Sequence, residues 1–139
     1  PEVSAGASDV SSHGKVREYL LEMQRKIARG NNVIMDGRDI GTVVLPQAEL
    51  KIFLTASSEA RAERRMKELA QKGMNIPFEE VLRDIERRDR QDSERAAAPL
   101  KKAEDAVLVD TSETDFAQSL ELLSKVVQER LHLDRKENE

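Results

Sequence analysis

The chain has 139 residues, a length that fits one domain and leaves little room for two. Zero cysteines exclude a disulfide scaffold and a cysteine nucleophile, and two histidines make a histidine-built metal site improbable. A net charge of -4 and an aromatic set of three phenylalanines and one tyrosine argue against a nucleic-acid polymer as partner. Residues 1–12 show no signal-peptide pattern and no apolar run approaches the ~18 residues of a membrane span, so a cytoplasmic location is expected.

The first half of the chain predicts one helix and two strands. Val16, Leu20, Met23 and Ile27 recur at helical spacing, which predicts an amphipathic helix over 16–29. The short apolar runs 33–35 and 50–54 are bounded by Gly, Pro or Asn and predict buried strands.

The second half predicts three helices and one strand. Ser57 and Ser58 can cap a helix that Gly73 ends, and a helix over about 78–96 follows. A strand over 106–109 precedes a helix over about 114–131, whose inward residues are expected to be Phe116, Leu120, Leu123, Val126 and Val127. Because strands alternate with helices, the fold class is α/β with a parallel sheet. Three strands are few for such a sheet, which usually has about four to six.

The segment 36–42 is the sharpest local signal for a site. It places Asp36, Arg38 and Asp39 directly after a predicted strand, at the sheet edge where ligands of parallel sheets bind. Two glycines in the segment allow a close approach of the backbone to a ligand. A solvent-facing turn is an equally good interpretation of the spacing alone, because Asp-Gly turns are common.

The helix over 78–96 changes character along one face. Its apolar stripe begins at Phe78 and continues at helical spacing into Arg88, Asp92 and Arg95. These charges either face solvent, with Arg88 and Asp92 as an ordinary i,i+4 pair, or point into a cleft that holds an anion.

A second arginine cluster lies in the preceding helix, at Arg61, Arg64 and Arg65. The guanidinium fork suits phosphate, although a solvated face is the more frequent role of an isolated cluster. Two arginine clusters together with the 36–42 segment favour a polyphosphate ligand. Ser8 and Arg17 would be unremarkable alone.

Taken together, these segments resemble the bacterial cytidylate kinases, or (d)CMP kinases, over residues 1 to about 131. Two segments are specific to that family: Met-Asp-Gly-Arg-Asp-Ile-Gly-Thr-Val-Val-Leu-Pro at 35–46, and Arg-Asp-x-x-Asp-Ser-x-Arg at 88–95. Supporting matches are Pro-Glu-Val-Ser at 1–4, Val-Arg-Glu at 16–18, Gln24-Arg25, Lys-Ile-Phe-Leu at 51–54, Arg-Ala-x-Arg-Arg at 61–65, Ala-Pro-Leu at 98–100 and Asp105-Ala106.

The resemblance implies a nucleoside monophosphate kinase fold of the P-loop type, here incomplete. The family's first strand and phosphate-binding loop have no counterpart, since Gly14-Lys15 lacks both the first glycine and the Ser or Thr of that motif. The chain is therefore expected to be a carboxyl-terminal portion, inactive alone. Residues 1–30 would end the CMP-binding region, and 31–139 would form the core with a lid at about 60–98.

The resemblance also implies transfer of the ATP γ-phosphoryl group to CMP or dCMP, with Mg2+ accompanying ATP. Arg38, Arg88 and Arg95 would be the catalytic residues. The substrate-binding set would be Ser8, Arg17, Arg38, Asp39, Arg88, Asp92 and Arg95. Arg61, Arg64 and Arg65 would belong to the lid over ATP, and Asp36 would lie near the metal.

Two other hypotheses remain open at this stage. A non-catalytic fragment of the same fold would expose a sheet edge and apolar surface and could self-associate, whereas full-length family members are expected to be monomeric. An arginine-rich RNA binder is the weaker alternative, because the chain is acidic overall.

Overall fold

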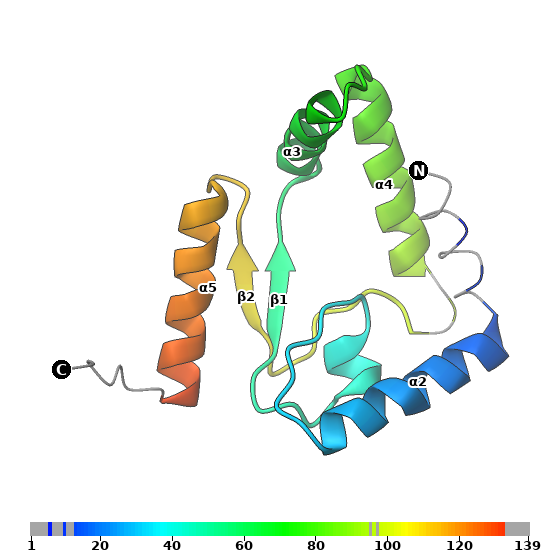
Figure 1. The fold of residues 1–139 in the computed structure, drawn as a ribbon, viewed down its shortest axis with the longest axis vertical. Coiled ribbons are helices and arrows are strands. Elements are labelled where there is room, and N and C mark those ends of the chain that lie inside the picture. The colour runs from blue at the N-terminus through cyan, green and yellow to red at the C-terminus, as the bar shows by residue number, and fades with distance from the viewer. Residues whose placement is uncertain (1–5, 7–9, 11–12, 95, 97, 133–139) are drawn as a thin grey trace.

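The computed structural model describes residues 6, 10, 13–94, 96 and 98–132. Their elements, in chain order, are helix α2 (Gly14–Arg29), the π-helical turn η1 (Ile40–Val44), strand β1 (Ile52–Thr55), helices α3 (Ser58–Gln71) and α4 (Phe78–Glu94), strand β2 (Val107–Asp110) and helix α5 (Phe116–Leu131). Figure 1 shows the two strands at the centre, with the α3–α4 hairpin above them and α2 below. No helix among the described residues is long and apolar enough to cross a bilayer.

The sheet consists of β1 and β2, which run parallel and pair from Ile52 with Val107 to Thr55 with Asp110. The chain crosses between them through α3 and α4, because parallel neighbours need a long connection. The expected α/β class is confirmed in this short form. Both strands lie where the sequence predicts them, shifted slightly toward the carboxyl terminus.

The prediction of a buried strand over 33–35 was wrong. The structure has irregular chain there, and the side chain of Ile34 is fully exposed. A short apolar run becomes a strand only when a neighbouring strand supplies ladder hydrogen bonds, and among the described residues this run pairs with neither β1 nor β2.

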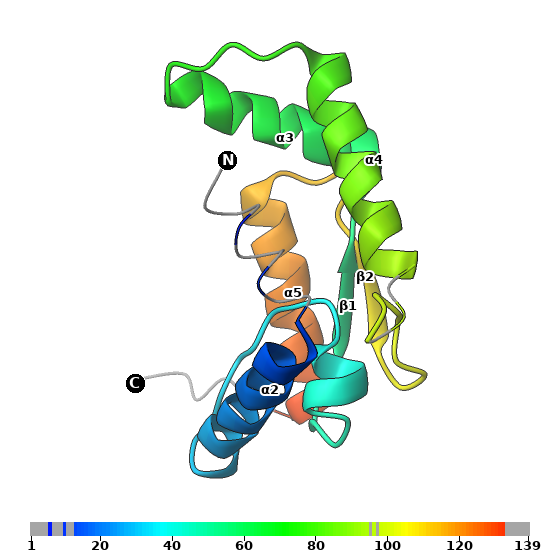
Figure 2. The ribbon, with the colours of Figure 1, turned by 90° about the vertical axis from the view of Figure 1, so that its right-hand side faces the viewer.

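The α3–α4 hairpin holds the core of the described structure. Ala62, Leu69 and Val81 are buried there, with partly buried Met66, Met74, Ile76, Phe78, Leu82 and Ile85 packed around them. The Ser57 hydroxyl caps α3 by accepting from the amide of Ala60 at 3.1 Å, as predicted. Gly73 ends the helix with a φ of +76°, a left-handed conformation that favours glycine. Figure 2 shows that the hairpin projects away from the strands.

Helix α5 lies beside the strands in both views and is capped by a reciprocal pair between Asp115 and Gln118. Its expected inward residues divide into two groups. Leu123, Val126 and Val127 are half-buried, whereas the expected burial of Phe116 and Leu120 was wrong, since they are 84% and 55% exposed. Helical periodicity identifies the apolar side of a helix, but the width of that side that is covered depends on the partner.

Candidate functional site

Arg17 and Asp39 form the best-buried ion pair among the predicted site residues. The Arg17 Nη2 donates to Asp39 Oδ2 at 2.6 Å, and the side chains are 24% and 15% exposed. Arg17 comes from the first turns of α2, and Asp39 directly precedes η1. The pair therefore places a cationic donor and an anionic acceptor side by side between α2 and η1.

Arg38 and Asp92 form a second pair, across 54 positions of the chain. The Arg38 Nε donates to Asp92 Oδ2 at 2.8 Å, and the Asp92 side chain is only 14% exposed. This contact joins the segment before η1 to the end of α4. The Asp92 side chain is thus largely covered, whereas Arg88, one turn earlier on α4, is exposed, so the two alternatives for the charged helix end stay open.

Arg61 and Asp89 join the two helices of the hairpin. The guanidinium donates from Nη1 to Oδ1 at 2.9 Å and from Nη2 to Oδ2 at 2.5 Å, which is the bidentate geometry that arginine favours. This hydrogen bonding lowers the pKa of the Asp89 carboxyl, and the charges of Arg38 and Arg88 lower it further. The same bond raises the pKa of Arg61.

The other two arginines of the α3 cluster, Arg64 and Arg65, have different surroundings. The Arg64 Nη2 donates to two backbone carbonyl oxygens. One belongs to Thr111, which is buried, and the other belongs to Thr114, at 3.1 Å. Arg64 therefore ties α3 to the chain that leaves β2. Arg65 pairs only one turn away, with Glu68 at 2.6 Å, on an exposed helix face.

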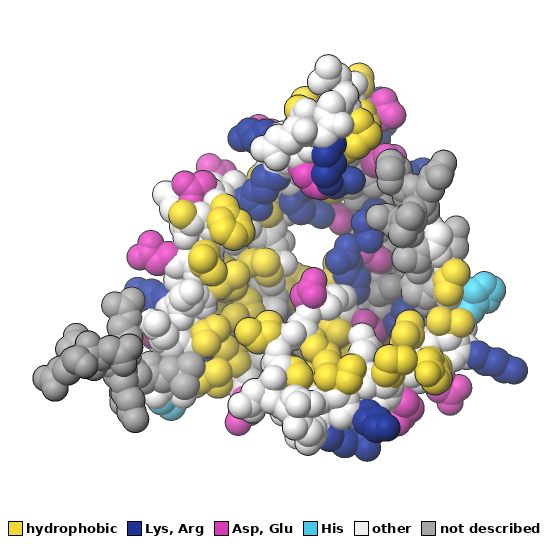
Figure 3. All heavy atoms as spheres, in the orientation of Figure 1, with side chains coloured by type: hydrophobic (Ala, Val, Ile, Leu, Met, Phe, Trp, Pro, Cys, Tyr) yellow, Lys and Arg dark blue, Asp and Glu magenta, His cyan; other side chains and the backbone are white. Residues whose placement is uncertain are grey.

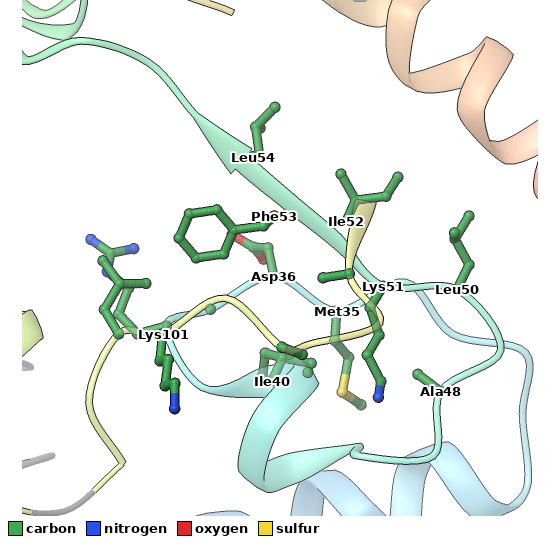
Figure 4. A pocket seen from close by; sticks show the side chains of 16 residues that line it. Met35, Asp36, Ile40, Ala48, Leu50, Lys51, Ile52, Phe53, Leu54 and Lys101 are labelled. Carbon is green, nitrogen blue, oxygen red and sulfur yellow. The ribbon is translucent and has the colours of Figure 1, made fainter. Parts of the chain in front are cut away.

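Asp36 lies in a different setting from the ion pairs. It is exposed and lines a cavity of about 230 Å3 with Met35, Ile40 and Phe53 (Figure 4). Among the described residues, no three His, Cys, Asp or Glu side chains gather closely enough to hold a metal ion. The predicted role of Asp36 stays a prediction.

Two of the predicted site residues, Ser8 and Arg95, lie outside the residues that the structure describes. Arg88 is exposed on α4, and its positive charge helps to lower the pKa of the neighbouring Asp89. Figure 3 shows a central opening in the molecule with Lys and Arg side chains along its rim. The pairs Arg38–Asp92 and Arg61–Asp89 bring two of the predicted arginines to the same helix, α4, from the chain before η1 and from α3.

Sequence reasoning missed the roles of Asp89, Arg25 and Lys51. The Lys51 ammonium, 8% exposed as a side chain, bonds Asp105 at 2.7 Å and the Pro46 carbonyl at 2.5 Å, so it pins the starts of both strands. This bonding lowers the pKa of Asp105. An available signal was the position of both charges at the start of a predicted strand, with Lys51 the second residue of 50–54 and Asp105 directly before 106–109. Arg25 donates to two backbone carbonyls, for which the sequence carries no signal.

The short parallel sheet with its flanking helices places the chain in the α/β class of proteins, with an arginine-rich helical hairpin beside the sheet. The cytidylate kinase family model matches residues 1–129, and the chain belongs to that family. The resemblance predicted from the motifs is thereby confirmed.

Similar proteins agree with this assignment. The chain is 53% identical over 133 residues to a cytidylate kinase of Thermosipho melanesiensis, covering 96% of this chain and 61% of that protein. It is 51% identical over 131 residues to one of Thermotoga neapolitana (94% and 60%) and 52% identical over 129 residues to one of Carboxydothermus hydrogenoformans (90% and 58%). The chain thus spans about three fifths of the length of the relatives it matches.

Proposed function

We propose that this chain carries the monophosphate-binding and lid portion of a cytoplasmic (d)CMP kinase, which transfers the ATP γ-phosphoryl group to CMP or dCMP. Membership of the cytidylate kinase family supports the reaction class. The observation that carries the assignment to this site is the half-buried Arg17–Asp39 pair next to Arg38.

Base selection rests on Arg17, Asp39 and Ser8. Cytosine offers O2 and N3 as acceptors and its N4 amino group as a donor, whereas uracil has an acceptor at position 4 and a proton on N3. Arg17 and Ser8 donate to the acceptors of cytosine, and the Asp39 carboxylate accepts from the amino group. With uracil, Asp39 would face a carbonyl oxygen, and two acceptors repel.

The sugar and phosphate are held by the charged end of α4 and by Arg38. Arg88 and Asp92 bind the sugar hydroxyls, and Arg38 and Arg95 bind the CMP phosphate. Because Arg38 bonds Asp92 in the structure, an incoming phosphate shares that guanidinium with the carboxylate. Positioning and charge neutralisation of this kind supply most of the catalysis in phosphoryl transfer, and Arg38, Arg88 and Arg95 are its catalytic residues here.

The lid, about 60–98, corresponds to the α3–α4 hairpin. Arg61, Arg64 and Arg65 lie on its first helix, and ATP phosphates would compete with Asp89 for Arg61. Mg2+ accompanies ATP and neutralises phosphate charge. An exposed single carboxylate such as Asp36 fits this ion, which usually takes one or two carboxylates together with substrate phosphates and waters.

In the reaction an oxygen of the CMP phosphate attacks the γ-phosphorus, the bond to the bridging oxygen breaks, and ADP leaves with that oxygen. The 139 residues contain no complete phosphate-binding-loop motif. We therefore propose that the chain binds CMP but does not turn it over alone.

The test is calorimetric titration of the chain with CMP, UMP and AMP, followed by Asp39→Asn. Selective binding of CMP is expected in the unaltered chain. In Asp39→Asn the carboxamide can donate to the uracil carbonyl, so the CMP:UMP affinity ratio should fall about tenfold or more. Asp84→Asn is the matched control, because Asp84 is an exposed residue of α4 that pairs with Arg87. Equal binding of CMP and UMP, or none of either, contradicts the proposal.

A second candidate is a self-associating fragment of the same fold. Its specific support is exposed apolar surface at Leu54, Leu108 and Phe116, which are 55%, 58% and 84% exposed. Light scattering after size exclusion decides it. A monomer at 100 µM, on the order of the concentrations where weak dimers form, contradicts this candidate.

A further inference from the structure

Arg25 contacts the backbone of η1, the turn that directly follows Asp39, the candidate base-reading residue. Its Nη2 donates to the carbonyl of Val43 at 2.8 Å, and its Nε donates to the carbonyl of Val44 at 3.1 Å. Both bonds are partly buried, and the Val44 residue itself is buried. Arg25 thus ties α2 to η1 through two directed bonds rather than through a surface ion pair.

These two carbonyls need such a donor because of the geometry of η1. The amides of Val43 and Val44 bond back to the carbonyl of Asp39 at 2.8 and 3.2 Å, and the amide of Leu45 bonds to that of Ile40 at 2.7 Å. The turn ends there, and the last carbonyls of a helical turn have no donor within the turn. A π-helical turn is rare and uses i to i+5 bonds, so it persists only where its surroundings hold it.

Helix α2 holds this segment at both ends. Arg17 bonds the side chain of Asp39 before the turn, and Arg25 bonds the carbonyls at the end of the turn. Arg17 and Arg25 are eight residues apart, or about 12 Å along the helix. The carbonyl of Asp39 is itself the acceptor of the first two turn bonds, so movement of the turn moves Asp39.

We propose that Arg25 is a positioning residue, which fixes η1 and thereby sets Asp39 in the place from which it distinguishes cytosine from uracil. The role of Arg25 in distinguishing cytosine from uracil rests on the proposed function. Arg25 touches neither the base nor the phosphate in this scheme, and it acts only through the backbone of the turn.

The test compares Arg25→Met, Arg25→Lys and Arg29→Met in the full 139-residue chain. Met keeps the apolar stem and removes all donors, Lys restores a single donor, and Arg29 is an exposed cation in the last turn of the same helix. Amide hydrogen exchange at Val43, Val44 and Leu45 is expected to speed up tenfold or more in Arg25→Met, to be intermediate in Arg25→Lys and to be unchanged in Arg29→Met. Unchanged exchange in Arg25→Met overturns the proposal.

Titration with CMP and UMP gives the second readout. The CMP:UMP affinity ratio should fall at least fivefold in Arg25→Met and recover in part in Arg25→Lys. Faster exchange with an unchanged ratio would mean that Arg25 only stabilises the turn, and the positioning role is then overturned. If the unaltered chain does not prefer CMP, the proposed function fails and the selectivity role falls with it, while exchange alone decides whether Arg25 holds the turn.

Discussion

The α3–α4 hairpin and the sheet with α5 differ in how far their apolar side chains are buried. The hairpin buries Ala62, Leu69 and Val81 within itself. The sheet and α5 leave Leu54, Leu108 and Phe116 more than half exposed, and α5 contains no buried residue. Both regions carry apolar residues at helix or strand spacing, so the difference lies in what packs against them.

This difference shows which part of the molecule buries its apolar side chains without help from the rest of the chain. Burial of apolar side chains supplies about 1.5–3 kcal/mol for each fully buried large residue, and the hairpin collects this within two consecutive helices. In the sheet region, backbone pairing and the Lys51–Asp105 contact hold the strands while the apolar faces contribute less. The hairpin should therefore respond to changes in packing, and the sheet region to changes in polar contacts.

Truncation of Leu69 should have the largest effect. Leu69→Ala leaves a cavity in the hairpin core and is expected to lower the free energy of unfolding by about 2–4 kcal/mol. Leu108→Ala, at a 58% exposed strand position, should cost less than about 1 kcal/mol. Urea unfolding followed by far-UV circular dichroism measures both. Equal losses for the two variants would remove the contrast between the regions.

Arg64 and Arg65 provide the next test, because they are adjacent on α3 but have different partners. Arg64→Met removes the donor to the carbonyls of Thr111 and Thr114 and should lower the free energy of unfolding by about 1–2 kcal/mol. Arg65→Met removes an exposed pair with Glu68 and should change it by less than about 0.5 kcal/mol. The same urea titration measures both, and a larger loss from Arg65→Met would contradict the bridging role of Arg64.

The elements were predictable where local chemistry decides them. Ser57 and Gly73 bound α3 as the capping and left-handed preferences of these residues require. The run 33–35 was not predictable in the same way, because a strand depends on a neighbour that periodicity cannot identify. Phe116 shows the same limit on a helix, since its apolar character predicts burial only if some surface covers it.

The candidate site was predictable in its residues but not in its pairings. Motif resemblance singled out Arg17, Asp39, Arg38 and Asp92, and the structure brings them together in two pairs. Ion pairs across many positions of the chain, such as that of Arg61 with Asp89, depend on the angle between helices, which no local pattern encodes. Contacts of an arginine with backbone carbonyls carry still less sequence signal, because every residue has a carbonyl.

The smallest expected effect is the pH dependence of the hairpin through Asp89. The hydrogen bonds from Arg61 lower the pKa of Asp89 in the folded chain below its ordinary value of about 3.9. A carboxyl with a lowered pKa contributes stability above its unfolded value and loses it as the pH falls through the folded value. Both side chains are about a third exposed, so solvent screening limits the contribution to less than about 1 kcal/mol.

Asp89→Asn isolates that contribution from the other carboxyls. Its free energy of unfolding should lie slightly below that of the unaltered chain at pH 7, and the gap should close as the pH falls below the ordinary pKa of an aspartate, about 3.9, and through the lowered pKa of folded Asp89. Glu68→Gln is the comparison within the same hairpin, because Lys72 and Arg65 lower the pKa of this exposed carboxyl within a single helix. Urea titrations at a series of pH values measure both gaps. A gap for Asp89→Asn that stays constant or widens on acidification would mean that the Arg61–Asp89 contact does not hold the two helices together.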